Sequence, residues 1–418
     1  MEKFILSPEK KTVFIMGAGA SKDDNIPVQN EILDKIIKGD FAYRQKKNQS
    51  GVKEYDRISR QIKQLVTRAF GSSAGAGISL ESLFNTLENA LNLRENIGSI
   101  ELREIRAYYR DLIQGIMYAT RTEADADLHN VKKHLGSGEA DVKSPYTEMG
   151  VQIYKHYASQ NAGFSFINFN YDICLDRVLL SMYDKNPDKS FDLDYGINLG
   201  NYILNAGHKF SFGRPRQRRM FLLRPHGSVN WLFCRSCGQV FSKLTRQNRA
   251  IDIREGTKCY LCKLSNLEPY IVYPSYNRIY ENKHLVKIWM NLEEVLADAD
   301  KWCFIGYSLP EADKYFTYVL TRIYNYRKAV KSAAKPLPEI SVVNINKASK
   351  KQHDMINALK SCGSKSKQVC SAVSEAENYF AEVMKDKDIF KKFEIYFDGV
   401  IKYECSFKEF TNKYFSVS

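Results

Sequence analysis

The fold of this 418-residue chain is decided by the stretch TVFIMGAGAS, Thr12 to Ser21. Its first half, Thr12 to Met16, is a short apolar run rich in β-branched residues, which is typical of a buried strand in a parallel sheet. Gly17 and Gly19 can adopt a positive φ, and Gly19 lets the backbone approach a bound pyrophosphate. Val28 to Ile37 then has the apolar spacing of a helix. A strand, a glycine loop and a helix in this order predict a dinucleotide-binding turn, although the loop taken alone also fits a purely structural turn.

Short apolar runs and helical patterns alternate along the rest of the chain. The runs that predict strands are Phe164 to Phe169, Phe221 to Leu223, Tyr270 to Tyr273, Trp302 to Ile305 and Ile340 to Ile345. The segments with helical spacing begin at Ile173, at Leu285 and at Ala312. This alternation predicts the α/β class, with a Rossmann-like, doubly wound parallel sheet. Such sheets bind their ligands at the carboxyl ends of the strands.

Two parts of the chain depart from this alternation. Residues 40–160 are mainly helical in pattern, with Ile78 to Leu93 and Leu102 to Tyr118 as clear amphipathic segments, so we expect a large helical insertion. Near the C-terminus, Phe393 to Phe397 and Val400 to Glu404 flank Asp398-Gly399, which predicts a β-hairpin.

These segments suggest a division of the chain into two domains. The first, residues 1–348, would be the nucleotide-binding domain, and it would include the helical insertion 40–160 and a small cysteine-containing insert at residues 230–270. The second, residues 349–418, would be a C-terminal helical and β-hairpin extension.

The composition restricts the class of protein. The chain is 44% hydrophobic and 12% aromatic, which is too apolar for a disordered protein. No run reaches the roughly 18 apolar residues of a transmembrane helix, and no secretory segment begins the chain, so we expect a cytoplasmic protein without a membrane partner. The net charge of +14 fits either a solvated basic face or a patch for nucleic acid or an acidic partner.

Two polar motifs follow predicted strands and contain candidate catalytic residues. Asn170 and Asp172 come after the run at 164–169 and, being two apart, point the same way in extended backbone. His226, beside Gly227, follows the run at 221–223 and could act as a base near neutral pH. The alternatives are a helix N-cap at Asn170 or Asp172 and a purely structural histidine.

Two further motifs follow the last predicted strands. Gly306-Tyr307-Ser308 comes after Trp302 to Ile305, and Asn344 and Asn346 lie at the end of the run at 340–345. Amide side chains at a strand end suit contacts with an adenosine ribose or a phosphate, and plain loop or cap residues are the alternative.

Four of the nine cysteines form two CxxC pairs, Cys234 with Cys237 and Cys259 with Cys262. Four thiolates suit tetrahedral zinc, and the spacer of 21 residues is slightly longer than usual for a zinc ribbon. Because four protein ligands leave no open position, such a zinc would be structural. Unligated reduced thiols are the alternative.

The order of these motifs resembles the sirtuin family. The family shows a GAGxS loop with a later Ile-Pro (here Ile26-Pro27), an Asn-x-Asp after a strand, a His-Gly, a CxxC…CxxC insert, a Gly-x-Ser and an Asn near the last strand. The resemblance covers residues at about 10–40, 164–235 and 300–348, plus the cysteine insert. It implies a Rossmann-like domain that binds NAD. The NAD-binding residues that it implies are Gly17, Ala18, Gly19, Ala20, Ser21, Ile26, Pro27, Gly306, Ser308, Asn344 and Asn346.

The resemblance also implies catalytic roles and an activity. Asn170, Asp172 and His226 would line the nicotinamide-ribose end, where the amide and the histidine assist cleavage of the glycosidic bond. Family deacetylases carry Asp-Phe-Arg after the Ile-Pro, and this chain lacks it. The Asn-Tyr-Asp motif and the helical insertion are similar to the sirtuin-like NADase branch of bacterial anti-phage systems. We therefore expect an NAD glycohydrolase (a hydrolase, NAD nucleosidase) that depletes NAD.

Two other functions stay open at this point. One is a protein deacylase or ADP-ribosyltransferase that uses the same pocket, and the other is a non-catalytic module that senses NAD or ADP-ribose and binds a partner or nucleic acid. Because a defence NADase needs a trigger, we expect a homo-oligomer or a partner protein. The resemblance suggests a HerA-type ATPase as one partner, and contact with nucleic acid would be weak or indirect.

Overall fold

The computed structural model describes residues 3–6, 10–41, 49–71, 78–120, 144–157, 163–185, 192–201, 219–242, 258–259, 261–272, 282–330, 335–345 and 388–417. Within these residues, no helix is both long enough and apolar enough to cross a membrane. Residues 349–387 of the expected C-terminal extension, and Asn346 of the expected site, lie outside the described residues.

Seven strands form the central sheet, in the order β12-β11-β10-β2-β3-β6-β4, and every neighbouring pair is parallel. The middle strand β2 and its neighbour β10 are buried along their whole length because helices cover both faces of the sheet. The predicted α/β class with a doubly wound parallel sheet is confirmed. The strands are β2 Thr12–Met16, β3 Phe164–Asn168, β4 Asp192–Asp194, β6 Arg219–Leu223, β10 Lys301–Ile305, β11 Glu339–Asn344 and β12 Ile401–Glu404.

The strand order reverses in the middle of this sheet. From β2, the chain adds β3 and then β6 on one side, and later β10, β11 and β12 on the other. Parallel sheets of this kind open a crevice at the carboxyl ends of the two strands where the order reverses. The glycine loop that follows β2 and the Gly306 loop that follows β10 therefore meet at this switch point.

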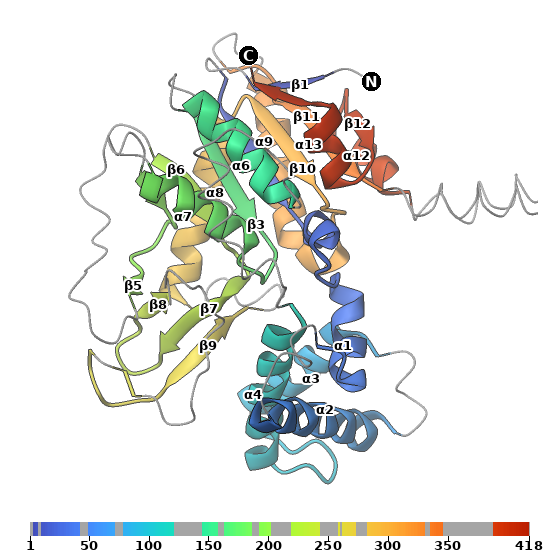
Figure 1. Cartoon of the computed structure of the whole chain (residues 1–418), viewed down its shortest axis with the longest axis vertical. Coiled ribbons are helices and arrows are strands. Elements are labelled where there is room, and N and C mark those ends of the chain that lie inside the picture. The colour runs from blue at the N-terminus through green and yellow to red at the C-terminus, as the bar shows by residue number, and fades with distance from the viewer. Residues whose placement is uncertain are drawn as a thin grey trace, which may run out of the picture.

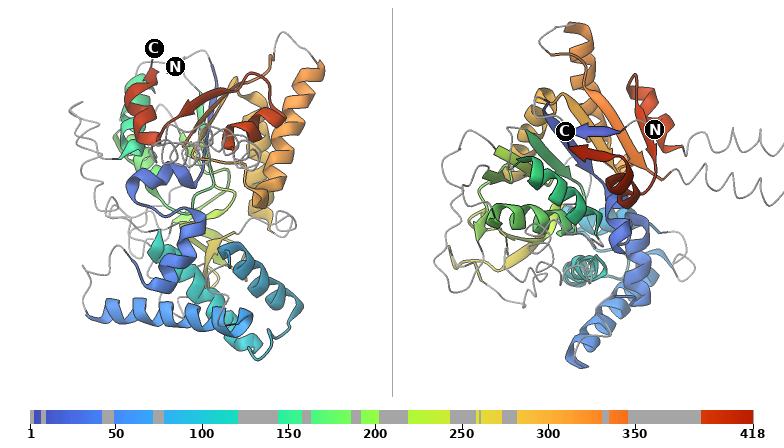
Figure 2. Two further views of the ribbon diagram at one scale, coloured as in Figure 1. Left: turned by 90° about the vertical axis from the view of Figure 1, so that its right-hand side faces the viewer. Right: turned by 45° about the horizontal axis from the view of Figure 1, so that its top comes forward.

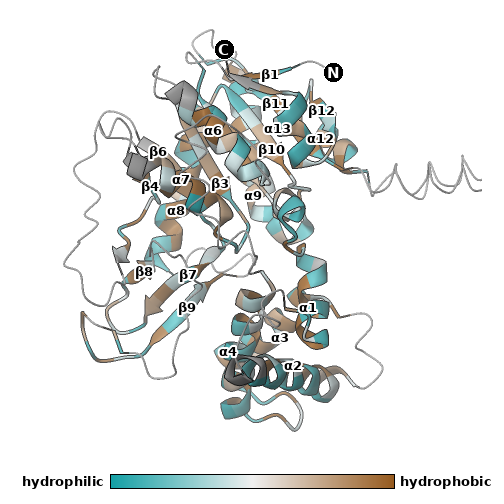
Figure 3. Ribbon diagram, viewed as in Figure 1, coloured by the Kyte–Doolittle hydropathy of each residue, from teal (hydrophilic) through white to brown (hydrophobic). Residues whose placement is uncertain are grey.

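Helices cover the two faces of the sheet in separate layers (Figures 1 and 2). On one face α8 packs against α9, and on the other α6 packs against both α7 and α13. Apolar residues, brown in Figure 3, gather on the central strands and on the helix sides that face them. The helices are α6 Pro145–Tyr157, α7 Cys174–Lys185, α8 Lys283–Asp298, α9 Lys314–Val330 and α13 Phe407–Lys413.

A group of four helices lies below the sheet in Figure 1 and has its own apolar core. In α3 the buried residues Leu80, Leu83, Phe84 and Leu87 follow the spacing of one helix face, and the Ser79 side chain caps the first turn by accepting from the Ser82 N–H. The helical character expected for residues 40–160 is confirmed in the described part. The helices are α1 Gln29–Lys38, α2 Gln49–Phe70, α3 Leu80–Leu93 and α4 Leu102–Ala119.

A second sheet of four strands, in the order β5-β8-β7-β9, carries the two cysteine pairs. Its middle strand β7 pairs antiparallel with both β8 and β9. Buried residues of β7 and β9 belong to the same apolar cluster as the four helices, so this sheet and the helical group share one core. The strands are β5 Gly200–Asn201, β7 Gly227–Cys234, β8 Val240–Ser242 and β9 Leu267–Ile271.

The predicted C-terminal β-hairpin is wrong. Phe393 belongs to helix α12, Ile389–Tyr396, whose first turn is capped by the Asp388 carboxylate. The buried aromatic residues Phe390, Phe393 and Phe397 follow helical spacing, which outweighs the turn signal at Asp398-Gly399. Strand β12 pairs in parallel with β11 and extends the central sheet. Phe415–Val417, β13, pairs with β1, Phe4–Leu6, at the other end of the chain.

Candidate functional site

The glycine loop packs directly against the loop that follows β10. The N–H of Gly17 donates to the Ile305 carbonyl at 2.9 Å, and the N–H of Gly19 donates to the Gly306 carbonyl at 2.9 Å. A Cβ on Gly306 would lie 2.0 Å from the Ala20 nitrogen, and a Cβ on Gly17 would lie 2.6 Å from the Gly306 oxygen. Glycine is therefore required here by close approach between two backbones.

The conformation of this loop differs from the expectation in one respect. Gly17 has a φ of −116°, and Gly19 is not among the glycines with positive φ, whereas Gly306 has a φ of 62°. The left-handed conformation is therefore found at Gly306, in the loop after β10, and not at Gly17 or Gly19. A 3-10 helix, η1 Ala18–Asp24, begins inside the glycine loop, and the buried pair Ile26-Pro27 follows it, with the Ile26 N–H donating to the Ser21 carbonyl.

Asn170 joins the loop after β3 to the glycine loop. Its Nδ2 lies 3.0 Å from the Gly17 carbonyl, 2.9 Å from Ser21 Oγ and 3.2 Å from Tyr146 OH. A carbonyl only accepts, so the nitrogen of the amide must face Gly17, which fixes the orientation of the side chain. The oxygen Oδ1 then points to the other side of the amide, and no hydrogen bond reaches it from the residues that the structure describes.

The hydroxyl groups around Asn170 complete a directed network. Ser21 Oγ donates to Asp172 Oδ2 at 2.8 Å, so the Tyr146 hydroxyl, also 2.8 Å from Ser21 Oγ, must be the donor in that pair. The other oxygen of Asp172 accepts from the Cys174 N–H at the start of α7. Asp172 therefore hydrogen-bonds to Ser21 of the predicted site and also caps the start of α7, which was the alternative prediction for this residue.

The Arg224 side chain hydrogen-bonds to the backbone of this loop. Arg224 was not among the predicted site residues. Its Nη2 donates to the carbonyls of Asn170 and Asp172, each at 2.6 Å, and its Nη1 pairs with the Asp176 carboxylate. The guanidinium is fully buried. A charged residue is seldom buried unless it is paired, so an arginine directly after an apolar strand was a usable signal.

His226 belongs to a second group of side chains, after β6 and β10. Its Nε2 lies 3.1 Å from Asp313 Oδ1, and Asp313 Oδ2 accepts a hydrogen bond of 2.7 Å from the Tyr307 hydroxyl. The Phe169 ring packs edge-on against the imidazole, with 5.0 Å between centroids, and against Tyr307 at 4.9 Å. Asp313 comes from the short η6, Glu311–Asp313, and is a second residue that the sequence analysis left without a role.

The remaining predicted binding residues lie around the Gly306 loop. Ser308 is half-buried and precedes Leu309, whose φ of 47° is unusual for a residue with a side chain. Asn344 Nδ2 donates to the Tyr307 carbonyl at 3.2 Å, so this amide holds the loop from the end of β11.

Burial and carboxylates shape the charge around the glycine loop. Burial raises the pKa of Asp24 to about 7, and the nearby carboxylates of Asp172 and Asp23 add to this shift, although a hydrogen bond from Ser144 Oγ opposes it. Burial, together with Asp172, also raises the pKa of Tyr146, which keeps its hydroxyl protonated as the network requires.

The predicted site residues thus form two groups joined by one loop. Ser21 hydrogen-bonds to both Asn170 and Asp172, and His226 pairs with Asp313. The Phe169 ring, one residue before Asn170, touches the imidazole, and the Arg224 side chain binds the Asn170 carbonyl. Asn170 and His226 are 6% and 7% exposed, so both catalytic candidates lie below the surface.

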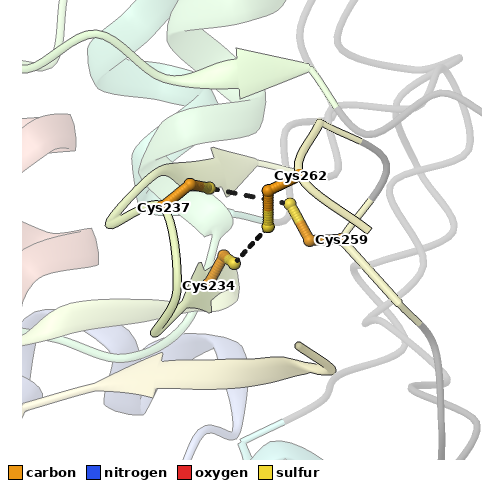
Figure 4. Close-up of side chains that lie close together, drawn as sticks. All are labelled: Cys234, Cys237, Cys259 and Cys262. Carbon is orange, nitrogen blue, oxygen red and sulfur yellow. Dashed lines mark hydrogen bonds between the residues drawn. The ribbon is translucent and has the colours of Figure 1, made fainter. Parts of the chain in front are cut away.

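The four predicted zinc ligands come together at one end of the second sheet (Figure 4). Their sulfur atoms all lie within 4.8 Å of one another, with 3.5 Å between Cys234 and Cys262 and 3.7 Å between Cys237 and Cys259. Four zinc–sulfur bonds of roughly 2.3 Å in a tetrahedron separate the sulfurs by about 3.8 Å, so the arrangement fits a zinc ion.

The surroundings of the cysteine cluster favour the thiolate at Cys234, whereas burial raises the pKa of Cys237 to about 12. Burial works against ionisation of Cys234, but hydrogen bonds from Ser265 Oγ, the Cys237 backbone and the neighbouring thiols lower its pKa to about 6. The thiolate is the form that binds a metal. Gly238, with a φ of 67°, provides the turn after the first pair, and its carbonyl contacts His284 Nε2 on α8.

No family model matches the sequence, and no curated protein matches it. The chain is similar to a solved structure described as a Sir2 homolog–NAD complex, at 12% identity and a TM-score of 0.34, with 81% of this chain and 79% of that chain covered. It is also similar to one described as a structural basis for the mechanism and regulation of Sir2 enzymes, at 11% identity and a TM-score of 0.33, with 97% and 91% covered. A third, a Sir2 homologue mutant in complex with ADP ribose, has 12% identity and a TM-score of 0.32, with 90% and 95% covered. At such low values, the function has to be argued from the residues of this chain.

Proposed function

We propose that this chain is an NAD glycohydrolase, which hydrolyses NAD to nicotinamide and ADP-ribose. One observation carries the proposal: the amide of Asn170 donates to the Gly17 carbonyl and to Ser21 Oγ, so the candidate catalytic amide is tied to the loop expected to hold the pyrophosphate. Both lie at the switch point of a doubly wound sheet, which is where such sheets bind dinucleotides.

The reaction breaks the bond between C1′ of the ribose and the nicotinamide nitrogen. The electron pair of that bond goes to the nicotinamide ring, whose positive charge it neutralises, and positive charge develops on the ribose. Water then forms a bond to C1′, and its proton passes to His226 and from there to solvent. Such proton transfer by a positioned base accelerates a reaction by roughly 10²- to 10⁴-fold.

Asn170 would orient the reacting groups with its amide oxygen. Because the nitrogen is committed to Gly17 and Ser21, Oδ1 remains to accept a hydrogen bond from the attacking water or from a ribose hydroxyl. Holding the water in line with C1′ lowers the entropy cost of the attack.

The hydrogen bonds of Asp172 support a positioning role for this residue. Both of its oxygens already accept hydrogen bonds, from Ser21 Oγ and from the Cys174 N–H. Asp172 would therefore act mainly by orienting Ser21 towards the dinucleotide, and its negative charge would favour the developing positive charge on the ribose.

Zinc would support the fold without entering the reaction. The four cysteines fill a tetrahedral set of ligands, and their cluster lies at the far end of β7 from His226, which directly precedes that strand.

The biological role in this proposal is anti-phage defence by NAD depletion, which the motif order and the lack of an Asp-Phe-Arg after Ile26-Pro27 support. A partner or a change of assembly would trigger the activity, and a HerA-type ATPase is the partner class suggested by the resemblance. Comparing the mass of the chain alone with that of the chain co-expressed with such an ATPase tests this: a monomer under both conditions would contradict it.

The catalytic proposal is tested by product analysis on the purified full-length chain, with any protein that copurifies. We expect nicotinamide and ADP-ribose in equal amounts without any peptide substrate, and little of either from Asn170→Ala or His226→Ala. Nicotinamide release that depends strictly on an acyl-lysine peptide would instead identify a deacylase. Wild-type rates in both variants would exclude these residues from the reaction.

A further inference from the structure

Each oxygen of the Asp313 carboxylate contacts a different side chain. Oδ1 lies 3.1 Å from His226 Nε2, and Oδ2 accepts from the Tyr307 hydroxyl at 2.7 Å. Asp313 is the last residue of η6, which continues directly into α9, and the N-cap of this helical segment is Pro310. The Asp313 side chain therefore lies inside a helical turn and not at a cap, and it contacts the histidine and the tyrosine.

The histidine is held on several sides. Its ring nitrogen Nε2 faces Asp313, and Phe169 packs against the ring edge-on. Phe169 in turn contacts Tyr307, and both rings contact Phe316 on α9, at 4.7 Å and 5.7 Å. In this arrangement Nε2 of the imidazole is directed towards the carboxylate.

The loop that presents Asp313 carries backbone strain. Leu309 has a φ of 47°, and the Asp313 N–H donates to the Pro310 carbonyl at 3.0 Å, which closes the turn. Strained residues of this kind persist where the surroundings impose them, often at functional sites. Here the strained turn brings the carboxylate up to the imidazole.

We propose that Asp313 is the positioning residue for His226, and that it fixes the proton of the neutral imidazole on Nε2 and leaves the lone pair on Nδ1. This inference rests on the proposed function, in which His226 is the base. A carboxylate only accepts hydrogen bonds, so the ring nitrogen that faces it must carry the proton. The other nitrogen, Nδ1, then accepts the proton of the attacking water.

This geometry determines where the proton of the attacking water goes. As water bonds to C1′, its O–H bond breaks and the proton moves to Nδ1, while the proton on Nε2 stays where it is. The resulting imidazolium is stabilised by the negative charge of Asp313, and Tyr307 keeps the carboxylate in place through the second oxygen. The imidazolium returns its proton to solvent after ADP-ribose forms.

Burial and the charge of Asp313 shift the pKa of two neighbouring side chains. Burial raises the pKa of Glu81 at the start of α3, and the charges of Asp313 and then Glu311 add to that shift. Burial, together with Asp313, raises the pKa of Tyr307, so the tyrosine stays a hydrogen-bond donor.

The inference is tested by four variants of the full-length chain: Asp313→Asn, His226→Ala, the double variant, and Glu311→Gln as a matched control in the same turn. We expect Asp313→Asn to lower kcat for NAD hydrolysis by roughly 10²-fold or more, with KM changed by less than about threefold. In the His226→Ala background, the same substitution should change kcat by less than about twofold, because its effect acts through the histidine. Multiplicative losses in the double variant would overturn the proposal.

A second readout does not depend on turnover. Ring ¹⁵N spectra of the histidine-labelled chain, with the His226 signals identified by their absence in His226→Ala, report which nitrogen carries the proton. We expect Nε2–H in the wild type and in Glu311→Gln, and a loss of this preference in Asp313→Asn. A wild-type proton on Nδ1 would overturn the proposal. If the chain released no nicotinamide from NAD, the proposed function would fail while this spectrum still decided the role of Asp313.

Discussion

Asn170 connects parts of the chain that are far apart in sequence. Its side chain reaches Gly17, Ser21 and Tyr146, which come from the loop after β2 and from α6. All of these groups are buried, so each hydrogen bond replaces one that would otherwise be made with water, and a lost partner costs about 1–3 kcal/mol.

Asn170→Asp tests whether NAD hydrolysis depends on the hydrogen bonds that the Asn170 amide donates. The carboxylate has the same size, but it cannot donate to the Gly17 carbonyl and it places a second negative charge near Asp172. We expect NAD hydrolysis to fall by about 10²-fold or more and the free energy of unfolding by about 1–3 kcal/mol. Product analysis and urea unfolding measure the two effects. Asn92→Asp, at an exposed position of α3, is the matched control, and equal losses in both variants would contradict the assigned role.

Asp24 makes the stability of the glycine loop depend on pH. Its pKa is about 7 in the folded chain against an ordinary value of 3.8, so between these values the folded chain binds more protons than the unfolded one. Stability therefore falls as the pH rises from about 4 to about 7.

Asp24→Asn should remove this dependence, because the amide oxygen still accepts from Ser144 Oγ and carries no charge. At pH 8 we expect the variant to be more stable than the wild type by on the order of 1–3 kcal/mol, and near pH 4 about equally stable. Urea unfolding at the two pH values checks this, with Asp34→Asn on the exposed side of α1 as control. A variant that is less stable at pH 8 would show that the Asp24 charge is favourable.

The polar residues of the site show where prediction from sequence stops. Asn170, Asp172 and His226 could be named because each follows an apolar strand, and the carboxyl ends of parallel strands meet at one edge. Tyr146 and Asp313 could not, because their roles depend on contacts across 125 residues to Ser21 and from η6 to His226. No local pattern records such contacts.

At the scale of elements, the two loops at the switch point fit only because both contain glycine. Gly306 has a positive φ and touches the backbone of Gly19 and Ala20. Gly399 also has a positive φ, 65°, but nothing lies within 4 Å of the position of its Cβ. Comparing substitutions at Gly306 and Gly399 therefore distinguishes the cost of a left-handed backbone from the cost of losing the contact between the two loops.

Gly306→Ala and Gly399→Ala should differ sharply. Both variants carry the cost of an alanine in the left-handed region, about 1–2 kcal/mol. Only Gly306→Ala also forces the β10 loop away from the glycine loop, so we expect a total loss of more than about 3 kcal/mol and no detectable NAD binding. Urea unfolding and calorimetric titration with NAD measure both quantities. Similar losses in the two variants would mean that the loops can move apart freely.

The cysteine cluster should contain one zinc ion per chain and stabilise the second sheet. Cys262→Ala removes one of four ligands, so we expect the zinc content to fall and proteolysis around β7 to β9 to increase. Metal analysis and limited proteolysis measure this, with Cys405→Ala, outside the cluster, as control. Full zinc content in Cys262→Ala would contradict the site.

Helices, strands and the cysteine pairs could be predicted from the sequence where a single pattern of spacing was present. The strand, glycine loop and helix at the N-terminus, the cysteine pairs and the helical insertion followed from periodicity and spacing. The C-terminal hairpin failed because Asp398-Gly399 gives a strong turn signal in either context. The aromatic spacing at Phe390, Phe393 and Phe397 shows that the preceding segment is a helix packed on the sheet.

At the scale of the whole molecule, the site lies where two apolar cores meet. Phe169 belongs to the core of the central sheet, whereas Tyr171 and Ile173 belong to the core shared by the helical group and the cysteine-bearing sheet. Asn170 and Asp172 alternate with these anchors, so a shift between the two cores would move both polar side chains.

The proposed cleavage of NAD by water is tested most directly by running the reaction in ¹⁸O-labelled water. We expect the wild-type chain, isolated with its copurifying proteins, to release nicotinamide and ADP-ribose in equal amounts, with one labelled oxygen in the ADP-ribose, and Asn170→Ala and His226→Ala to release almost none. Unlabelled ADP-ribose products that form only with an acyl-lysine peptide, or unchanged rates in both variants, would contradict it.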